Sequence, residues 1–354
     1  MIRMGSHNIG DGAPCFITFE AGATIEGFEN AERLISYTAE AGADAVKFQF
    51  IDPDRLVSDR KLEVTYSVLV DRETGETGTI TEPLYDILCR RVLEPDEWRA
   101  LKRHSDSLGL AFFATANYED DIDLIVEMGC DSIKISSSDV DHLPFIRQAA
   151  RTGLCLQLDT GNATIGEIEM AVEVIRDEGN ENIIIHQCPS GYPAYLPSIN
   201  LKMIPTLKQM FPYPIAYSDH SPGWEMDVAA VAMGANLIEK TITLDRTTPS
   251  IEHMFSLEPP ELEGFIKTIR DVEIAMGESR RSFPLAEAKK RRMGRRSIHV
   301  LHDLPAGHVL TDGDLEYRRP GFGIPSPETD KLLGKPLTTA KMAGDRLEWD
   351  DIGR

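Results

Sequence analysis

Eight short apolar runs, each followed by a longer amphipathic segment, alternate from about residue 14 to residue 275. Short apolar runs bounded by turn residues are typical of buried strands, and longer amphipathic segments are typical of helices. Eight strand–helix units are the number that closes a (β/α)8 barrel, whereas a doubly wound open sheet usually has fewer. The sequence therefore predicts an α/β fold of the TIM-barrel type, with the open sheet as the alternative.

These two patterns also place the individual elements on the sequence. The predicted strands are Cys15–Phe19, Ala45–Phe50, Ala111–Ala114, Ser132–Ser136, Leu154–Leu158, Ile183–Gln187, Ile215–Tyr217 and Leu237–Lys240. The predicted helices span residues 28–41, 95–107, 119–128, 142–151, 164–178, 199–210, 224–233 and 259–276.

Two other stretches interrupt this alternation. Segment 50–92 is long, charged and without a strong period, so we expect an excursion over the top of the barrel that contributes to a site. The charge-rich stretch GESRRSFPLAEAKKRR then marks the end of the alternation. We predict a barrel domain over residues 1–277, a linker over 278–293 and a small β-rich domain over 294–354, whose thin core needs another surface to rest on.

The charge and cysteine content exclude several kinds of partner and compartment. The formal net charge is −21, and an acidic surface repels nucleic acid and anionic membranes. No apolar run approaches the ~18 residues that cross a bilayer, and no signal-peptide pattern opens the chain. The five cysteines are scattered without CxxC spacing, which indicates reduced thiols in a cytoplasmic protein.

Polar side chains gather where the predicted strands end, the face on which barrel enzymes build their sites. Lys47, Lys134 and Lys240 are associated with three of these strands, and serines or threonines follow several others. Lysine supplies a point charge and hydroxyls supply directed hydrogen bonds, a combination that suits a phosphate and a carboxylate. The alternative is that these lysines pair with acids inside a polar barrel. The candidate strand-end residues are Glu20, Lys47, Gln49, Thr115, Lys134, Ser136, Ser137, Asp139, Asp159, Thr160, Gly161, Ser190, Tyr192, Ser218, Asp219, His220, Glu239 and Lys240.

His220, in the sequence YSDHSPGW, is a candidate metal ligand. A single histidine is also compatible with a hydrogen-bonded turn residue, and we keep both interpretations. Glu239, at the end of the next strand, would lie near it as a co-ligand or a base.

Several motifs together resemble those of the sialic acid synthase family. AVKFQ, DSIKISSSD, YSDHSPG, LIEKTITLDR and EHMFSLEP are similar to its barrel signatures, in the same order. RRSIHV, YRRPGFGI and LLGKPL are similar to its C-terminal antifreeze-like (SAF) domain. The family is NeuB-like and includes N-acetylneuraminate, legionaminic and pseudaminic acid synthases and spore coat polysaccharide biosynthesis protein E. Each motif alone is weak, but their order covers nearly the whole chain.

The resemblance implies a reaction and an assembly. Phosphoenolpyruvate condenses with an aldose or acylated aminosugar to a 2-keto-3-deoxy sugar acid, with release of phosphate, in surface polysaccharide biosynthesis. A divalent metal, Mn²⁺ or Mg²⁺, polarises the aldehyde. The family forms a homodimer by swapping the lid domain.

The resemblance also implies roles for individual residues. The catalytic residues would be Glu20, Lys134, Asp139 and Glu239. The contacts to phosphoenolpyruvate would be Lys47, Thr115, Lys134, Ser137, Ser190 and Ser218, with Arg295 and its neighbour Arg296. The contacts to the acceptor sugar would be Gln49, Tyr192, Glu252 and Arg319, the last from the lid of a partner subunit. His220 would be a metal ligand.

The sequence departs from the family pattern at several positions. The family's second metal histidine is Thr241 here, and the serine before Thr-Gly is Asp159. The first-strand motif reads EAGATIEG, without the family's Asn-His pair, and the aspartate before HMFSLEP is Glu252. Losing one of two histidines weakens the metal site, for which Asp159, Glu239 and His253 are candidate further ligands.

Three functional hypotheses follow. The first is the phosphoenolpyruvate-dependent synthase, a C–C bond-forming transferase. The second is a non-catalytic sugar-binding relative, which the missing histidine favours. The third is an aldolase that forms a Schiff base through a strand lysine.

Overall fold

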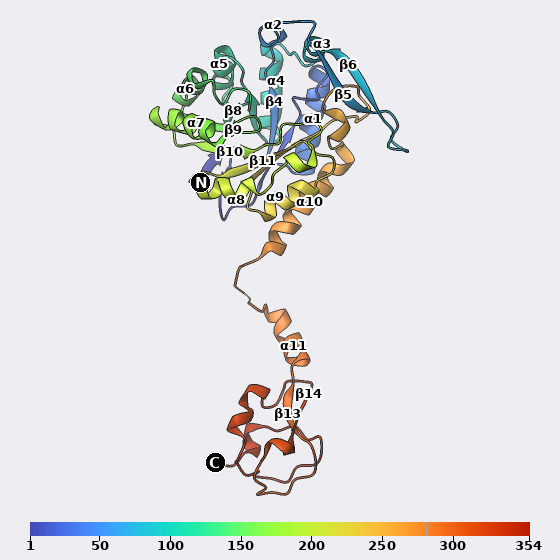
Figure 1. Ribbon diagram of the computed structural model, residues 1–354, viewed down its shortest axis with the longest axis vertical. Helices are drawn as coiled ribbons and strands as arrows, with labels where there is room; N and C mark the ends of the chain where they lie inside the picture. Colours follow the sequence, from blue (N-terminus) through green and yellow to red (C-terminus); the bar gives the residue numbers. More distant parts are fainter. Residues whose placement is uncertain (281) are drawn as a thin grey trace. The chain divides into compact units, whose positions relative to one another are not determined.

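The computed structural model describes residues 1–280 and 282–354, which form two compact units, Met1–Gly277 and Glu278–Arg354. Eight parallel strands of the first unit close into a barrel in the order β10-β11-β12-β3-β4-β7-β8-β9, which confirms the predicted TIM barrel (Figure 1). The barrel strands are β3 (Phe16–Glu20), β4 (Ala45–Gln49), β7 (Ala111–Thr115), β8 (Ser132–Ile135), β9 (Cys155–Asp159), β10 (Ile183–Gln187), β11 (Ile215–Asp219) and β12 (Leu237–Thr241).

Helices follow the strands and surround the barrel (Figure 1). They are α1 (Phe28–Ala41), α4 (Pro95–Ser107), α5 (Glu119–Glu127), α6 (Leu143–Arg151), α7 (Ile165–Asp177), α8 (Met203–Met210), α9 (Glu225–Ala232) and α10 (Pro259–Met276). The helix predicted at 199–210 begins only at Met203, because Asn200 has a positive φ of 50°, outside the helical region, and residues 201–202 form a turn. The main apolar core lies between the helices and the outward faces of the strands.

An N-terminal hairpin closes the end of the barrel opposite the strand ends. Its strands, β1 (Ile2–Met4) and β2 (His7–Ile9), pair antiparallel. The buried side chains of Ile2, Met4 and Ile9 join residues from the starts of the barrel strands, such as Phe16 and Ala111, in a second apolar cluster. Burial of apolar side chains in this layer seals the floor, so any site must open at the other end.

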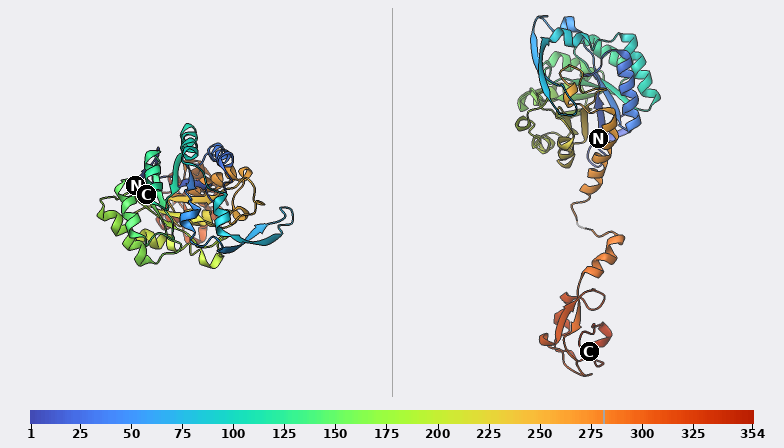
Figure 2. Two further views of the ribbon diagram at one scale, coloured as in Figure 1. Left: turned by 90° about the horizontal axis from the view of Figure 1, so that it is seen from above. Right: turned by 90° about the vertical axis from the view of Figure 1, so that its right-hand side faces the viewer.

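The excursion of residues 50–92 has more regular structure than the sequence pattern predicted. It contains α2 (Pro53–Leu56), the antiparallel hairpin of β5 (Glu63–Leu69) and β6 (Thr77–Pro83), and α3 (Leu84–Cys89). The left view of Figure 2 shows this hairpin extending from the side of the barrel. Tyr66 and Val68 of β5 form a small buried cluster with Ile87 of α3.

The second unit has its own small apolar core. Helix α11 (Leu285–Gly294) leads into β13 (Ser297–Val300), which pairs antiparallel with β14 (Leu315–Arg318). The rest of its β-structure consists of isolated bridges rather than longer strands. The predicted linker 278–293 includes Arg281, which lies outside the described residues, and much of its remainder is helical. The core consists of Ile298, Val300, Leu304, Leu310, Leu315, Ile324, Leu332, Leu337 and Leu347.

No helix among the described residues is long and apolar enough to cross a membrane.

Gly22 provides a test of how tightly the strand ends are packed. A Cβ atom at this position would lie 2.4 Å from the backbone nitrogen of Gln49 and 2.7 Å from the carbonyl carbon of Phe48. We therefore expect Gly22→Ala to force β3 and β4 apart and to destabilise the barrel by about 1–3 kcal/mol, measured as a lowered unfolding midpoint. Gly264→Ala on α10, where no atom lies within 4 Å, is the matched control. Equal midpoints for the two variants would show that the Gly22 contact is not tight.

Candidate active site

Strand register brings many of the predicted residues to one end of the barrel. Glu20 on β3 is opposite Lys47 on β4, and Ser218 on β11 is opposite Glu239 on β12. Lys134 on β8 is in register with Thr115 on β7. These residues lie on the strands rather than after them, since β3, β7, β9, β11 and β12 each run one or two residues further than predicted.

One contact spans the barrel lumen. β8 and β12 are on opposite sides of the closed strand order, yet the Lys134 Nζ atom donates to the Glu239 Oε1 atom at 2.6 Å. The Ser218 hydroxyl donates to the same oxygen at 3.1 Å, and the Lys47 Nζ atom lies 3.7 Å from it. Side chains from β4, β8 and β11 therefore converge on one carboxylate oxygen of β12.

Glu20 and Gln49 extend this group. Glu20 forms an ion pair with Lys47, and its other carboxylate oxygen accepts a hydrogen bond of 2.8 Å from the Ala23 amide. The Gln49 side-chain amide lies 3.5 Å from that same oxygen. Burial raises the pKa of Glu20, and Glu239 adds to the increase, although Lys47 opposes it. A carboxyl group whose pKa is raised in this way is suited to accepting a proton.

Asp159 provides a second carboxylate for Lys134. Its Oδ2 atom lies 2.9 Å from the Lys134 Nζ atom, and its Oδ1 atom lies 3.7 Å from the Nδ1 atom of His186. His186 is fully buried on β10 and its Nε2 atom bonds to the Gln157 side chain at 2.9 Å. Sequence reasoning missed His186 and Gln157, although polar residues within the runs LCLQL and IIIHQ were a signal of this inner layer.

The opposite charges of Lys134 and Glu239 each stabilise the ionised form of the other. Burial alone lowers the pKa of Lys134, but Asp159 and Glu239 outweigh burial and keep the pKa above its ordinary value. Burial likewise raises the pKa of Glu239, but Lys134 and Lys47 outweigh it and bring the pKa well below its usual range. An ammonium group that stays protonated is suited to binding an anion and unsuited to attacking a carbonyl.

His220 packs beside two aromatic rings. Its ring centroid is 4.5 Å from that of Tyr192 and 6.3 Å from that of Phe255. The His220 Nδ1 atom lies 3.0 Å from the Pro189 carbonyl oxygen. Burial lowers the pKa of His220 to about 4, so the imidazole is neutral at neutral pH.

The donor set does not fit a resident divalent metal in this arrangement. Within residues 1–280 and 282–354, no group of three or more His, Cys, Asp or Glu side chains could hold a metal ion. Glu239 and Asp159 are both paired with Lys134, and the position of the family's second histidine is Thr241. His253 bonds to the Thr243 hydroxyl at 2.7 Å. The requirement for a metal stays a prediction from the resemblance, and we derive no step through one.

Lys240 does not belong to the convergent group. Successive strand residues point to opposite faces, so Lys240 points away from the side on which Glu239 lies. It forms an ion pair with Asp219, and its Nζ atom lies 3.7 Å from a carboxylate oxygen of Asp227. All three side chains are fully buried. All three strand lysines pair with acids, as the alternative interpretation stated, but only Lys240 does so away from the group that converges on Glu239.

Other predicted residues lie nearer the surface. The Ser137 hydroxyl accepts a hydrogen bond of 3.2 Å from Asn162, and Asp139 accepts one of 2.7 Å from Ser136. Ser190 is exposed, and Thr115 is buried. No contact joins Ser137, Asp139 or Ser190 to Lys134 among the described residues, so their roles stay predictions.

Glu252 lies within the electrostatic influence of a cation that sequence reasoning missed. Arg91, from the turn after α3, is buried, and it is the charged group that acts most strongly on Glu252. Among the charged groups around Arg91, Glu252 has the largest effect on the pKa of the guanidinium, which it raises. The position of Arg91 depends on the path of the 50–92 excursion. Nothing in the local sequence RRV, which contains Arg91, indicates that this side chain is buried beside the site.

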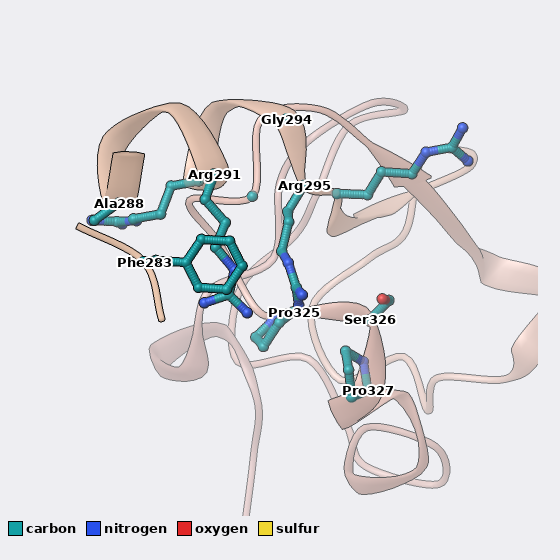
Figure 3. Close-up of a pocket in the computed structure, with 11 residues that line it drawn as sticks. Phe283, Ala288, Arg291, Gly294, Arg295, Pro325, Ser326 and Pro327 are labelled. Atoms are coloured by element: carbon teal, nitrogen blue, oxygen red, sulfur yellow. The ribbon is translucent and has the colours of Figure 1, made fainter. Parts of the chain in front are cut away.

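Arg295 and Arg319 belong to the second unit, and both are exposed. Arg295 lines a hollow of about 690 Å³ with Arg291, Arg292 and Arg296 (Figure 3). The Arg291 guanidinium lies 4.5 Å from the centre of the Phe283 ring. The contacts predicted for Arg295 and Arg319 with ligands in a barrel stay predictions.

The chain is therefore a TIM-barrel protein with a small second unit at its C-terminus. The open end of its barrel carries two lysines and several carboxylates. Residues 34–281 match the model of the NeuB family, and residues 295–353 match the SAF domain. The chain belongs to the NeuB family, as the motifs predicted.

Several relatives are similar over almost the whole chain. The N,N'-diacetyllegionaminic acid synthase of Legionella pneumophila is 32% identical over 97% of this chain and 96% of its own length. The spore coat polysaccharide biosynthesis protein SpsE of Bacillus subtilis is 31% identical, over 99% of this chain and 96% of its own. The crystal structure of the N-acetylneuraminic acid (sialic acid) synthetase of Leptospira borgpetersenii, in complex with citrate, has a TM-score of 0.71 at 30% identity, covering 82% of this chain and 94% of that one.

The pKa of Glu252 predicts a pH dependence of stability. Burial raises this pKa from 4.5 to about 7, and Arg91 opposes the increase. The folded protein then binds the proton more tightly than the unfolded chain, so the ionised carboxylate lowers stability as the pH rises from about 4.5 to about 7. We expect Glu252→Gln to be more stable than wild type by roughly 1–3 kcal/mol at pH 8, with the difference shrinking toward zero at pH 4.5.

Denaturant unfolding at the two pH values measures this difference. Glu263→Gln, at an exposed position on α10, is the control and should change stability equally at both. A Glu252→Gln effect of the same size at pH 4.5 and pH 8 would contradict the assignment.

Proposed function

We propose that the protein is a sialic acid synthase-type enzyme that condenses phosphoenolpyruvate with an aldehyde aminosugar, giving a 2-keto-3-deoxy sugar acid and phosphate. The convergence of Lys47, Lys134 and Ser218 on the Glu239 carboxylate is the observation that carries the proposal. The ammonium groups of both lysines and the Ser218 hydroxyl contact the Glu239 carboxylate in the structure. A phosphate or a carboxylate of the substrate needs donors of the same kind. The names of the relatives, among them legionaminic acid and sialic acid synthases, support the reaction class.

In the proposed reaction, carbon 3 of phosphoenolpyruvate forms a bond to the aldehyde carbon, and the aldehyde oxygen gains a proton. Water adds at carbon 2, and the bond between carbon 2 and the phosphate oxygen breaks. The water supplies both protons that the products require, one on the new hydroxyl and one on the phosphate. Glu20, whose pKa burial raises, is placed beside Lys47 to take the first of these protons.

The proposal also covers the setting of the enzyme. It would act in the cytoplasm as a homodimer with swapped lid domains, in the synthesis of a surface polysaccharide. Arg319 of a partner lid would contact the acceptor, and Arg295 would contact phosphoenolpyruvate. These statements derive from the family resemblance.

The Schiff-base aldolase is disfavoured by the state of the strand lysine. Lys134 is held protonated between Asp159 and Glu239, whereas imine formation needs a neutral amine. Borohydride trapping with a keto acid tests this directly, and a covalent adduct would favour the aldolase. Loss of all turnover with retained phosphoenolpyruvate binding would instead indicate the non-catalytic relative.

We expect Lys134→Ala to lower the rate of phosphate release by on the order of 10²–10³-fold, because the site loses one cation that stabilises developing charge. The assay combines phosphoenolpyruvate with a panel of hexoses, aminosugars and acetamido sugars, with manganese and with EDTA. Lys267→Ala, which removes an exposed lysine on α10, is the control and should keep wild-type activity.

Lys134→Ala also leaves two buried carboxylates without their cation, so its folding needs a separate check. Ser218→Ala keeps every charge, and we expect it to weaken phosphoenolpyruvate-dependent thermal stabilisation. Full turnover by a folded Lys134→Ala variant would contradict the proposed function.

A further inference from the structure

Arg91 is a buried cation without an ion-pair partner among the described residues. Only 6% of its surface is exposed, and its guanidinium donates one hydrogen bond, to the Ser250 hydroxyl at 3.1 Å. The neighbouring Arg90 forms an ion pair with Glu82 instead. A guanidinium has five N–H donors, and no Arg91 nitrogen is among the fully buried polar atoms of the described residues that lack a hydrogen-bond partner, so the donors that Ser250 does not use remain open to a bound acceptor. The geometry therefore points to an acceptor that is not part of the protein.

Arg91 stands at one end of a row of alternating charges. From Lys134 the row passes through Glu239 and Lys47 to Glu20 by contacts of ion-pair distance. Glu252 is influenced most by Arg91 among charged groups, and then by Glu20 and Lys47. Arg91 and Glu252 therefore lie at the Glu20 end of the row, away from the part formed by Lys134 and Asp159.

We propose that Arg91 binds the sugar acceptor together with Glu252, and that this pair selects a neutral group, an acylamino group or a pair of hydroxyls, over a phosphate or carboxylate. The inference rests on the proposed function. The guanidinium donates and the carboxylate accepts, so the pair matches a group that carries both an oxygen acceptor and an N–H or O–H donor.

The charge balance favours a neutral acceptor over an anionic one. The row and the groups at its ends contain four carboxylates but only three cations. The carboxylates are those of Glu20, Asp159, Glu239 and Glu252, and the cations are Lys47, Lys134 and Arg91. Acidic residues outnumber basic ones about two to one in residues 1–277. Phosphoenolpyruvate adds further negative charge, so a second anion would meet repulsion that a neutral sugar does not.

The test measures steady-state phosphate release with phosphoenolpyruvate and matched acceptors, N-acetylhexosamines and their 6-phosphates. Wild type should prefer the unphosphorylated member of each pair. Arg91→Gln should raise the KM for the acceptor by about 10- to 100-fold, because a hydrogen bond from a charged donor is lost. The KM for phosphoenolpyruvate should stay within about twofold. Arg90→Gln is the matched control and should leave both constants unchanged.

The outcomes separate this inference from the proposed function. Phosphoenolpyruvate-dependent stabilisation and phosphate release by wild type, with an unchanged acceptor KM in folded Arg91→Gln, would overturn the role of Arg91 alone. Preference for the 6-phosphates would overturn the neutral acceptor. Absence of both stabilisation and release in wild type would overturn the proposed function and this inference with it. If Arg91→Gln does not fold, Arg91→Lys, which keeps the charge but not the planar donor group, carries the same test.

Discussion

The ion pair between Lys134 and Glu239 is the interaction on which the charged end of the barrel depends. Each group is buried on its own strand, where an unpaired charge is costly, and each is the 2.6 Å partner of the other. Because the two strands lie on opposite sides of the lumen, the pair connects the two sides of the barrel at its open end. Ser218 and Lys47 contact the Glu239 side of this pair, and Asp159 contacts the Lys134 side.

This arrangement has a consequence for any anion that enters. The two lysines already hold Glu20, Asp159 and Glu239, so a phosphate must replace a carboxylate as the partner of each lysine. A carboxylate released in this way takes up a proton or finds another cation, since an unpaired buried charge is costly. Binding of an anion and movement of a proton are therefore coupled in this site.

The barrel could be predicted from the sequence because each of its strands and helices carries its own periodic signal. The helices at 28–41, 95–107 and 259–276 begin and end where predicted. Five strand ends were placed one or two residues too early, because polar residues such as Ser218 and Asp219 still pair with the neighbouring strand, whereas the ends of β4 and β8 were placed one residue too late. The β5–β6 hairpin was missed because its faces are only partly buried, which leaves a weak pattern.

The sequence could predict only those site residues whose location follows from their position along a strand. Lys47, Lys134 and Glu239 were found at strand ends, but Lys240, one residue further, faces away, a distinction that depends on strand register. Arg91 was out of reach because a long excursion brings it to Glu252. Asp159 connects the two levels: where the family has a serine, this chain places a second carboxylate 2.9 Å from Lys134. That charge raises the pKa of Lys134 and so holds the lysine more firmly in the protonated state, which makes Asp159 part of the electrostatics of this site.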